Sequence, residues 1–355
     1  MALFSIPRTR IAGIAACVPG NREYTAGYRW ISQKERELFI RTVGVETRRV
    51  VSKGTTTSDL CLVAARRVMV DLGWRADEIG LLVVVTQTRD YLIPATGGIL
   101  QDRLGLPHST IALDVHQGCS GYVYGLSLMG SLMNTTGIRK GLLLVGDISS
   151  RNTSYRDKSA YPLFGDAGTA TAIELSEEGA AMQFNLEGDG SGYDAILIPD
   201  GGIRQGLSKS SFNYKKYGEG IYRNNLQVAL DGMKVFNFSL REVVPNVKEL
   251  LKFAGKTMDS IDYIVFHQAN KLINESLRKM LKVDEVKTPA SIRNYGNTSS
   301  ASIPLTMVSE LSGELSSRKT NLLLSAFGIG LSWGAVLMET DTIICPEIIE
   351  YKLNT

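Results

Sequence analysis

The sequence predicts an α/β protein built from two related halves. Two observations lead to this prediction: apolar runs of strand length alternate with helical patterns along the chain, and landmarks of the first half recur in the second. Apolar runs without polar alternation are typical of strands that are buried on both faces of a sheet. The strands are therefore expected to lie between layers of helices.

The elements of the first half follow in chain order. A buried first strand over residues 11–17 is expected to stop at Val18-Pro19-Gly20, because proline and glycine favour a turn. Further strands are expected at 81–86, 111–115, 141–145 and 169–175, and helices at 60–72 and 120–133. In the second half the same patterns predict strands at 263–266, 321–325 and 335–339 and helices at 243–253 and 302–311.

Three landmarks occur twice in the same order: a glycine that ends a helix before a buried strand, a glycine-containing turn that opens a helix, and a run of leucines. They begin at Gly73 and Gly255, at Gly118 and Gly296, and at Gly141 and Asn321, which are 182, 178 and 180 residues apart. This spacing indicates a duplicated α/β unit. The halves are expected to meet near residues 176–190, which gives domains of residues 1–180 and 181–355.

The composition is that of an ordinary globular protein. The chain has 355 residues, of which 44% are hydrophobic and 21% charged, and a formal net charge of +3. This balance does not favour nucleic-acid binding. No apolar run approaches the roughly 20 residues that span a bilayer, so neither a nucleic acid nor a membrane is expected as a partner.

Four cysteines lie at positions 17, 61, 119 and 345 without a CxxC pair. Their spacing favours neither a zinc site nor a dense disulfide framework, so no metal is expected. Free thiols are typical of proteins in the reducing cytoplasm, which is the expected location.

Cys119 is the main candidate for a reactive group. Residues 111–122 have the pattern of a strand, a tight turn and the start of a helix, with Cys119 in the turn. The positive end of the helix dipole stabilises a thiolate, the form of cysteine that attacks acyl groups. The repeat places Asn297 at the equivalent helix start and His267 directly after a strand of the second half. A two-fold relation between the halves would bring these three groups toward a common centre.

Five motifs in chain order resemble those of the β-ketoacyl-acyl-carrier-protein synthase III family. They are Asp114-Val115 with Cys119-Ser120-Gly121-Tyr122, residues 164–168, His267-Gln268-Ala269-Asn270, residues 296–304 and residues 327–334. The match extends from about residue 10 to residue 340. The resemblance implies the thiolase-like fold, in which duplicated α/β halves form a five-layer αβαβα sandwich.

The resemblance also implies a two-stage reaction. An acyl group moves from coenzyme A or acyl carrier protein to Cys119, and malonyl-acyl carrier protein then loses carbon dioxide and attacks the acyl-cysteine. His267 and Asn297 are expected to hold the enolate, because an imidazole N–H and an amide NH₂ are hydrogen-bond donors. The backbone N–H groups of Cys119 and Gly330 are expected to hold the second oxyanion. No cofactor is expected beside these thioester substrates.

Substrate and partner contacts are implied in the same way. Asn270 and Ile329 are expected to bind substrate, and Ile93 is expected to reach the floor of the acyl tunnel from the second copy in a homodimer. Carrier proteins are acidic, so basic residues are expected beside the tunnel. Lys271 and Arg278, on an expected helix after His267, are the candidates.

The sequence departs from the family pattern at several positions. Gln117 lies two residues before the nucleophile, Gly118-Cys119-Ser120-Gly121 replaces a commoner alanine-rich version, and Ile329 interrupts a run of three glycines. Leu38 lies nearest the place of a tryptophan that stacks on the adenine of coenzyme A. Because this aromatic platform is lost, a donor bound to carrier protein is expected rather than acetyl-coenzyme A.

The same residues bear on three other activities of this superfamily. A degradative thiolase would need a second cysteine in the C-terminal glycine loop, and Cys345 lies 15 residues beyond Gly330. A non-catalytic partner subunit usually lacks the cysteine, whereas Cys119 is present. Transfer of the acyl group to an oxygen or nitrogen acceptor stays open as an alternative; it often accompanies loss of the asparagine, and Asn297 is present.

Overall fold

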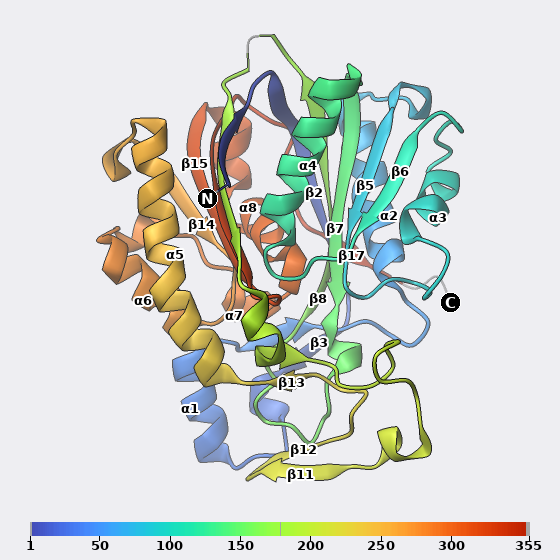
Figure 1. Cartoon of the computed structure of the whole chain (residues 1–355), viewed down its shortest axis with the longest axis vertical. Coiled ribbons are helices and arrows are strands. Elements are labelled where there is room, and N and C mark those ends of the chain that lie inside the picture. The colour runs from blue at the N-terminus through green and yellow to red at the C-terminus, as the bar shows by residue number, and fades with distance from the viewer. Residues whose placement is uncertain (1, 178, 353–355) are drawn as a thin grey trace.

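Two mixed sheets form the centre of the molecule in the computed structural model, which describes residues 2–177 and 179–352 (Figure 1). The first sheet contains, in spatial order, β17 (Ile349–Tyr351), β2 (Thr9–Pro19), β8 (Asp166–Leu175), β7 (Lys140–Ile148), β5 (Leu81–Val85) and β6 (Ile111–Val115). The second contains β1 (Ala2–Ile6), β9 (Met182–Gly188), β16 (Ser332–Thr340), β15 (Thr320–Gly328) and β14 (Tyr263–Phe266).

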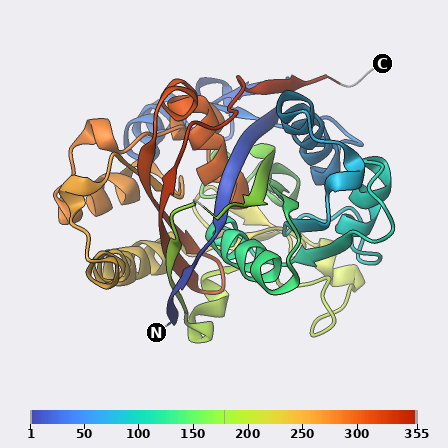
Figure 2. The same cartoon turned by 90° about the horizontal axis from the view of Figure 1, so that it is seen from above.

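Helices form three layers around these sheets. The outer face of the first sheet is covered by α2 (Thr57–Leu72) and α3 (Thr96–Arg103), and that of the second by α5 (Gly232–Ala254) and α6 (Lys271–Leu281). Between the sheets lie α4 (Gly121–Thr136) and α8 (Ser302–Ser317) (Figure 2). This arrangement is the five-layer αβαβα sandwich that the family resemblance implies. Among the described residues, no helix combines the length and apolar character needed to cross a membrane.

Strand β5 illustrates why the apolar runs lack polar alternation. Leu81, Val83 and Val85 lie in the central hydrophobic cluster with α4 and α8, whereas Leu82 and Val84 lie in the outer cluster with α2. Successive side chains of a strand point to opposite faces of the sheet. A strand that is covered by helices on both faces must therefore be apolar at every position.

The two sheets repeat the same strand pairings. β5 pairs in parallel with β7, with Leu81 opposite Gly141, and β14 pairs in parallel with β15, with Tyr263 opposite Leu322. The antiparallel pairs β7–β8 and β15–β16 are likewise equivalent. The first and last strands are exchanged, because β1 pairs with β9 in the second sheet and β17 pairs with β2 in the first. β1 therefore belongs to the sheet of the second half, and β17 belongs to the sheet of the first half. The division into domains of residues 1–180 and 181–355 stays a prediction.

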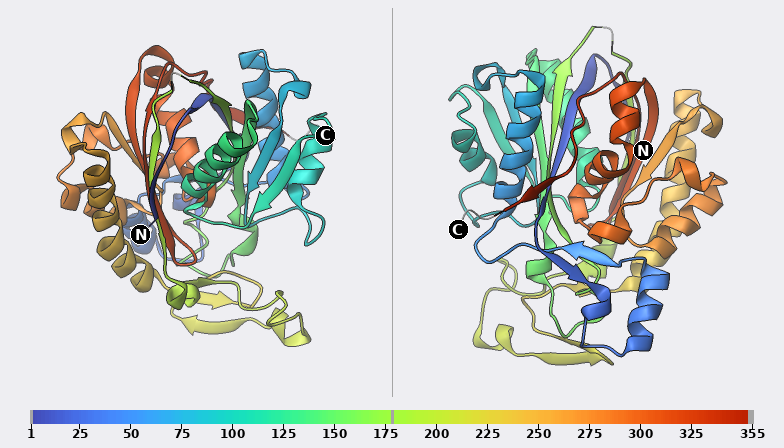
Figure 3. Two further views of the ribbon diagram at one scale, coloured as in Figure 1. Left: turned by 45° about the horizontal axis from the view of Figure 1, so that its top comes forward. Right: turned by 180° about the vertical axis from the view of Figure 1, so that it is seen from behind.

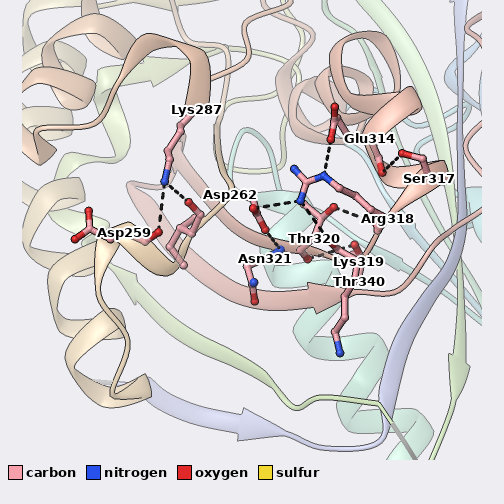
Figure 4. A network of polar contacts seen from close by, with 11 residues as sticks. Asp259, Asp262, Lys287, Glu314, Ser317, Arg318, Lys319, Thr320, Asn321 and Thr340 are labelled. Atoms are coloured by element: carbon pink, nitrogen blue, oxygen red, sulfur yellow. Dashed lines mark hydrogen bonds and ion pairs between the residues drawn. The ribbon is translucent and has the colours of Figure 1, made fainter.

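A polar network fixes the amino-terminal ends of β14 and β15 (Figure 4). Asp262 accepts hydrogen bonds from the backbone N–H of Asn321 at 2.7 Å and from the guanidinium of Arg318 at 3.3 Å. Lys287 donates to the backbone carbonyl of Ile261 at 2.7 Å. Because the two strands are parallel, this register also sets their carboxyl ends at one edge of the sheet. His267 and the glycine-rich loop after Gly328 begin there.

The remaining elements gather at one end of the molecule (Figure 3). They are α1 (Gln33–Val43), β3 (Arg22–Tyr24), β4 (Thr47–Arg49), α7 (Ile292–Tyr295), and the short strands β10 (Ile196–Leu197), β11 (Lys215–Gly218), β12 (Ile221–Arg223) and β13 (Ala229–Leu230). None of these elements was predicted from the sequence; strands of two to four residues have too little periodicity to detect. The segment between β9 and α5, residues 189–231, nevertheless contributes to the site described next.

Candidate active site

A small pocket of about 60 Å³ lies at the junction of the two halves. Cys119 of the first half lines it together with His267 and Asn297 of the second. Each of these residues is no more than 5% exposed. The three groups that the sequence singles out therefore share one enclosed space.

The turn between β6 and α4 positions Cys119. The Gly121 N–H donates to the Gly118 carbonyl at 2.7 Å and closes this turn. Gly328 at the end of β15 lies against the nucleophile, since a Cβ placed on it would be 2.5 Å from the Cβ of Cys119. Only glycine fits this close approach between the two halves.

Cys119 is held as a neutral thiol. Burial raises the pKa of the Cys119 thiol to about 11, and the negative charge of Asp147 also raises it. Hydrogen bonds from the Ile329 backbone N–H and from the Ser299 hydroxyl lower this pKa, but by less than burial raises it. The helix dipole was expected to stabilise a thiolate; the loss of water around the sulfur acts in the opposite direction and favours the thiol.

His267 follows β14 and is also held neutral. Its Nδ1 lies 2.6 Å from the Ser302 Oγ, which accepts a hydrogen bond from the Gln268 backbone N–H at 3.3 Å. Burial lowers the pKa of the imidazole to about 3, while a hydrogen bond with the Ser299 backbone raises it by less. We infer that the Ser302 hydroxyl donates to Nδ1, which leaves the ring proton on Nε2.

Asn297 is fixed by its backbone and by its side chain. Its N–H donates to the Leu163 carbonyl at 2.9 Å, and its carbonyl accepts from the Gly165 N–H at 3.0 Å. Its Oδ1 accepts from the Ser299 N–H at 2.8 Å, and its Nδ2 lies 3.4 Å from the Ala269 carbonyl. With the amide oxygen engaged, the NH₂ group is the part of the side chain left to donate into the pocket.

Ser299 touches all three of these residues, and the sequence did not single it out. Its backbone N–H donates to the Asn297 Oδ1 at 2.8 Å. Its backbone raises the pKa of His267 and its hydroxyl lowers the pKa of Cys119, each through hydrogen bonding. Its φ of 52° lies in the left-handed region, which is uncommon for a residue with a side chain. A strained backbone conformation persists only where the surrounding structure holds it in place, and such conformations cluster at active sites.

Asp147, at the end of β7, joins the two halves beneath the site. One carboxylate oxygen accepts from the Gln87 backbone N–H at 2.8 Å, and the other accepts from the Ser300 hydroxyl at 2.7 Å and N–H at 3.2 Å. Asp147 is only 1% exposed. It therefore positions the segment that carries Asn297 and Ser299 against the half that carries Cys119.

Two backbone N–H groups lower the pKa of the Cys119 thiol by hydrogen bonding to it, that of Ile329 and that of Cys119 itself. Gly330, to which the family resemblance assigns the role of oxyanion donor, does not line the Cys119 pocket but the cavity beside it. The loop turns directly after Gly328, so the amide of the next residue faces the sulfur. The geometry thus favours a donor one residue earlier than expected.

Of the three expected substrate-binding residues, two lie at the site. Ile329 and Asn270 both line the Cys119 pocket. Asn270 also caps α6, because its Oδ1 accepts from the Ile273 N–H at 2.8 Å. Ile93 is 86% exposed in the single chain and lines neither the pocket nor the cavity beside it.

The two expected carrier-protein contacts differ in their surroundings. Lys271 is exposed at the start of α6, and its side chain packs against Gly44 at the end of α1. Arg278 is already engaged, since it donates to Glu275 at 2.7 Å and to the Val283 carbonyl at 2.9 Å. Lys271 is therefore the freer of the two for an acidic partner.

Comparisons with known proteins agree with this architecture. Residues 113–190 match the model for 3-oxoacyl-[acyl-carrier-protein (ACP)] synthase III, and residues 251–340 match the model for its C terminal region. A β-ketoacyl-[acyl-carrier-protein] synthase III from Geobacillus kaustophilus is 33% identical over 84% of this chain and 89% of its own length. One from Neisseria gonorrhoeae is 30% identical over 93% of this chain and 98% of its own length.

Solved structures give the same result. A 3-oxoacyl-(acyl-carrier protein) synthase from Burkholderia xenovorans superposes with a TM-score of 0.93 at 34% identity, covering 98% of this chain and 99% of that one. The synthase III of Pseudomonas aeruginosa superposes with a TM-score of 0.82 at 26% identity, covering 95% and 99%. The chain belongs to the β-ketoacyl-[acyl-carrier-protein] synthase III family.

Proposed function

We propose that this protein accepts an acyl group on Cys119 and condenses it with malonyl-acyl carrier protein, with loss of carbon dioxide. The observation that carries this proposal is the pocket shared by one thiol, one neutral imidazole and one carboxamide. Acyl transfer to an oxygen or nitrogen acceptor needs no enolate and would leave His267 and Asn297 without a developing charge to stabilise.

In the first stage the Cys119 sulfur attacks the thioester carbonyl. The new S–C bond forms as the bond to the pantetheine sulfur breaks, and the thiol proton passes to the departing thiolate. The oxyanion of the tetrahedral intermediate would accept hydrogen bonds from the backbone N–H groups of Cys119 and Ile329. Because the free thiol has a pKa of about 11, its deprotonation accompanies attack rather than preceding it.

In the second stage the malonyl group loses carbon dioxide. The resulting negative charge resides on the thioester oxygen, where the His267 Nε2–H and the Asn297 NH₂ would donate hydrogen bonds. The carbanion then attacks the acyl-cysteine carbonyl, a C–C bond forms, and the Cys119 sulfur leaves and regains a proton. A neutral imidazole suits this role, because it donates through N–H without first binding a proton.

A donor bound to acyl carrier protein is proposed over acetyl-coenzyme A. Leu38 on α1 is 48% exposed and offers no aromatic surface to an adenine, which weakens coenzyme A binding by about 1–2 kcal/mol. Lys271 and Arg278 on α6, which packs near the end of α1, are the proposed contacts with the acidic carrier.

We also propose a homodimer and a cytoplasmic location. Tyr91, Leu92 and Ile93 form an apolar run that is 62%, 75% and 86% exposed in the single chain. Three consecutive exposed apolar side chains favour burial against another protein surface, here a second copy. The four cysteines are all unpaired, which fits a reducing compartment.

The function is tested by supplying the protein with acyl- and malonyl-carrier protein and identifying products by mass. The expected product is a 3-oxoacyl-carrier protein two carbons longer than the donor acyl group, formed by the unmodified protein and not by Cys119→Ala. Cys61→Ala, which alters another buried thiol, serves as the matched control. Formation of an ester or amide instead, with no carbon dioxide released, would refute the proposal.

A further inference from the structure

A second, larger cavity of about 480 Å³ lies beside the Cys119 pocket. Phe164, Ile196 and Ile329 line both spaces, so they form the boundary between them. An acyl chain attached to Cys119 that is too long for the smaller pocket would extend past this boundary. The lining of the larger cavity therefore selects among acyl groups.

The lining of this cavity combines two kinds of side chain. Ile196, Leu197, Ile198 and Val228 are apolar, while Gln87, His116, Gln117, Ser149 and Asn152 are polar. Within the part of the chain that the structure describes, the side chains of Gln87, His116, Ser149 and Asn152 form no hydrogen bond with another residue. These donors and acceptors are therefore available to a ligand.

Gln117 is held in place by its amide nitrogen. Its Nε2 donates to the Ser120 hydroxyl at 2.9 Å and to the Ser332 hydroxyl at 2.8 Å. The hydroxyl oxygens of Ser120 and Ser332 lie 2.6 Å apart, so the three side chains are all hydrogen-bonded to one another. This fixes the side chain and leaves its Oε1 as an acceptor without a partner among the described residues.

Gln87 is fitted to the turn that carries the nucleophile. Its Oε1 occupies the space beside Gly118, only 2.4 Å from where a Cβ on that residue would lie. Any larger residue at 118 would displace the Gln87 amide. Gly118 and Gln117, two departures from the family pattern, thus both support polar groups next to Cys119.

We propose that the acyl group accepted by Cys119 carries a hydroxyl, and that Gln87, Gln117 and Asn152 bind this hydroxyl. This inference rests on the proposed acylation of Cys119 and adds the class of acyl group. Neither lysine nor arginine occurs among the described residues that line the cavity, so a neutral substituent suits it better than a carboxylate. The apolar side chains of the lining accommodate the hydrocarbon part of the same group.

A saturated chain in this cavity would meet amide groups that it cannot hydrogen-bond. A site built to bond a substrate hydroxyl discriminates strongly against the analogue that lacks it, because its polar groups then lose water without a replacement. One or two such bonds correspond to a preference of about tenfold.

The test compares acylation of Cys119 by the 3-hydroxybutyryl and butyryl thioesters of pantetheine, which exclude carrier recognition. Rates of acyl-enzyme formation are read by intact mass at matched concentrations, and kcat/KM is derived for each thioester. We expect the hydroxyacyl thioester to react about tenfold faster. Gln87→Met and Asn152→Leu should remove this preference mainly by speeding the butyryl reaction, whereas Gln183→Met on β9, away from the cavity, should keep it.

Equal rates for the two thioesters, or faster acylation by butyryl, would overturn the inference and leave the proposed function intact. An unchanged preference in both Gln87→Met and Asn152→Leu would also overturn it, because the discrimination would then arise elsewhere. Failure of both thioesters to acylate Cys119, while acylated carrier proteins also fail, would refute the proposed function itself.

Discussion

The imidazole Nδ1 of His267 lies 2.6 Å from the hydroxyl oxygen of Ser302, at the first residue of α8. This contact sets the ring orientation and, with the Gln268 N–H bonded to the same oxygen, favours the tautomer with its proton on Nε2. Ser302 does not line the Cys119 pocket and is therefore a positioning residue.

Replacing Ser302 by alanine should impair condensation while sparing acylation. Without the hydroxyl, Nδ1 loses its donor and the ring is free to adopt the other tautomer. We expect carbon dioxide release from malonyl-carrier protein to fall about tenfold, the effect of one lost hydrogen bond, with an unchanged rate of Cys119 acylation. Ser309→Ala is the matched control, since the Ser309 hydroxyl on the same helix has no partner among the described residues. Equal losses in both stages would contradict this role.

His267 should make the folded protein sensitive to acid. Burial lowers its pKa to about 3, below the value of about 6.5 in an unfolded chain. The unfolded state therefore binds a proton that the folded state does not, and stability is lost as the pH falls from about 6.5 toward 3. Between pH 7 and pH 5 the wild type should lose about 2 kcal/mol more of its free energy of unfolding than His267→Gln. Denaturant titrations at both pH values measure this, and parallel losses would contradict it.

Asp147→Asn should make the Cys119 thiol more acidic. The Asp147 charge raises the pKa of Cys119, so a neutral amide of the same shape should lower that pKa from about 11. The pH profile of iodoacetamide alkylation, followed by mass on the Cys119 peptide, reports the shift. Asp194→Asn, which removes an exposed carboxylate, is the control. A Cys119 pKa that stays the same or rises in Asp147→Asn would be inconsistent with the geometry.

The assignment of the second oxyanion donor to Ile329 can be tested through its backbone. Ile329→Pro removes the N–H, whereas Ile329→Gly keeps it and removes only the side chain. We expect the proline variant to lose about 10²- to 10³-fold in kcat, the usual effect of removing one oxyanion donor, and the glycine variant to lose far less. Circular dichroism would establish that both variants fold. Similar activities of the two variants would contradict this assignment and would indicate that another backbone N–H, such as that of Gly330, donates to the oxyanion.

Much of the fold could be predicted because buried strands in this architecture must be apolar throughout. The predicted strand 263–266 coincides with β14, the predicted strand 321–325 lies within β15, and the duplicated landmarks correspond to equivalent strand pairs. The exchange of β1 and β17 between sheets could not be predicted, because edge pairing depends on which partner lies nearby in space. Helix α5 begins at Gly232, before the predicted residue 243.

The site was predicted only as far as its reactive side chains. Cys119, His267 and Asn297 carry recognisable motifs, and the structure brings them together. The roles of Ser299 and of the Ile329 amide depend on backbone conformation, such as the φ of 52° at Ser299, which residue types alone do not specify. Asp147 lies two residues after a predicted strand, yet its partners Gln87 and Ser300 come from distant segments and only folding places them there.

The division of labour among the three pocket residues is tested most directly by trapping the acyl-enzyme. Purified wild type, Cys119→Ala, His267→Ala and Asn297→Ala are each mixed with acyl-carrier protein and then with malonyl-carrier protein, and intact masses are recorded after each addition. His267→Ala and Asn297→Ala should gain the acyl mass and retain it in the presence of malonyl-carrier protein, the wild type should gain and then lose it, and Cys119→Ala should never gain it. Acylation of Cys119→Ala, or normal turnover of the acyl group by His267→Ala and Asn297→Ala, would contradict the account.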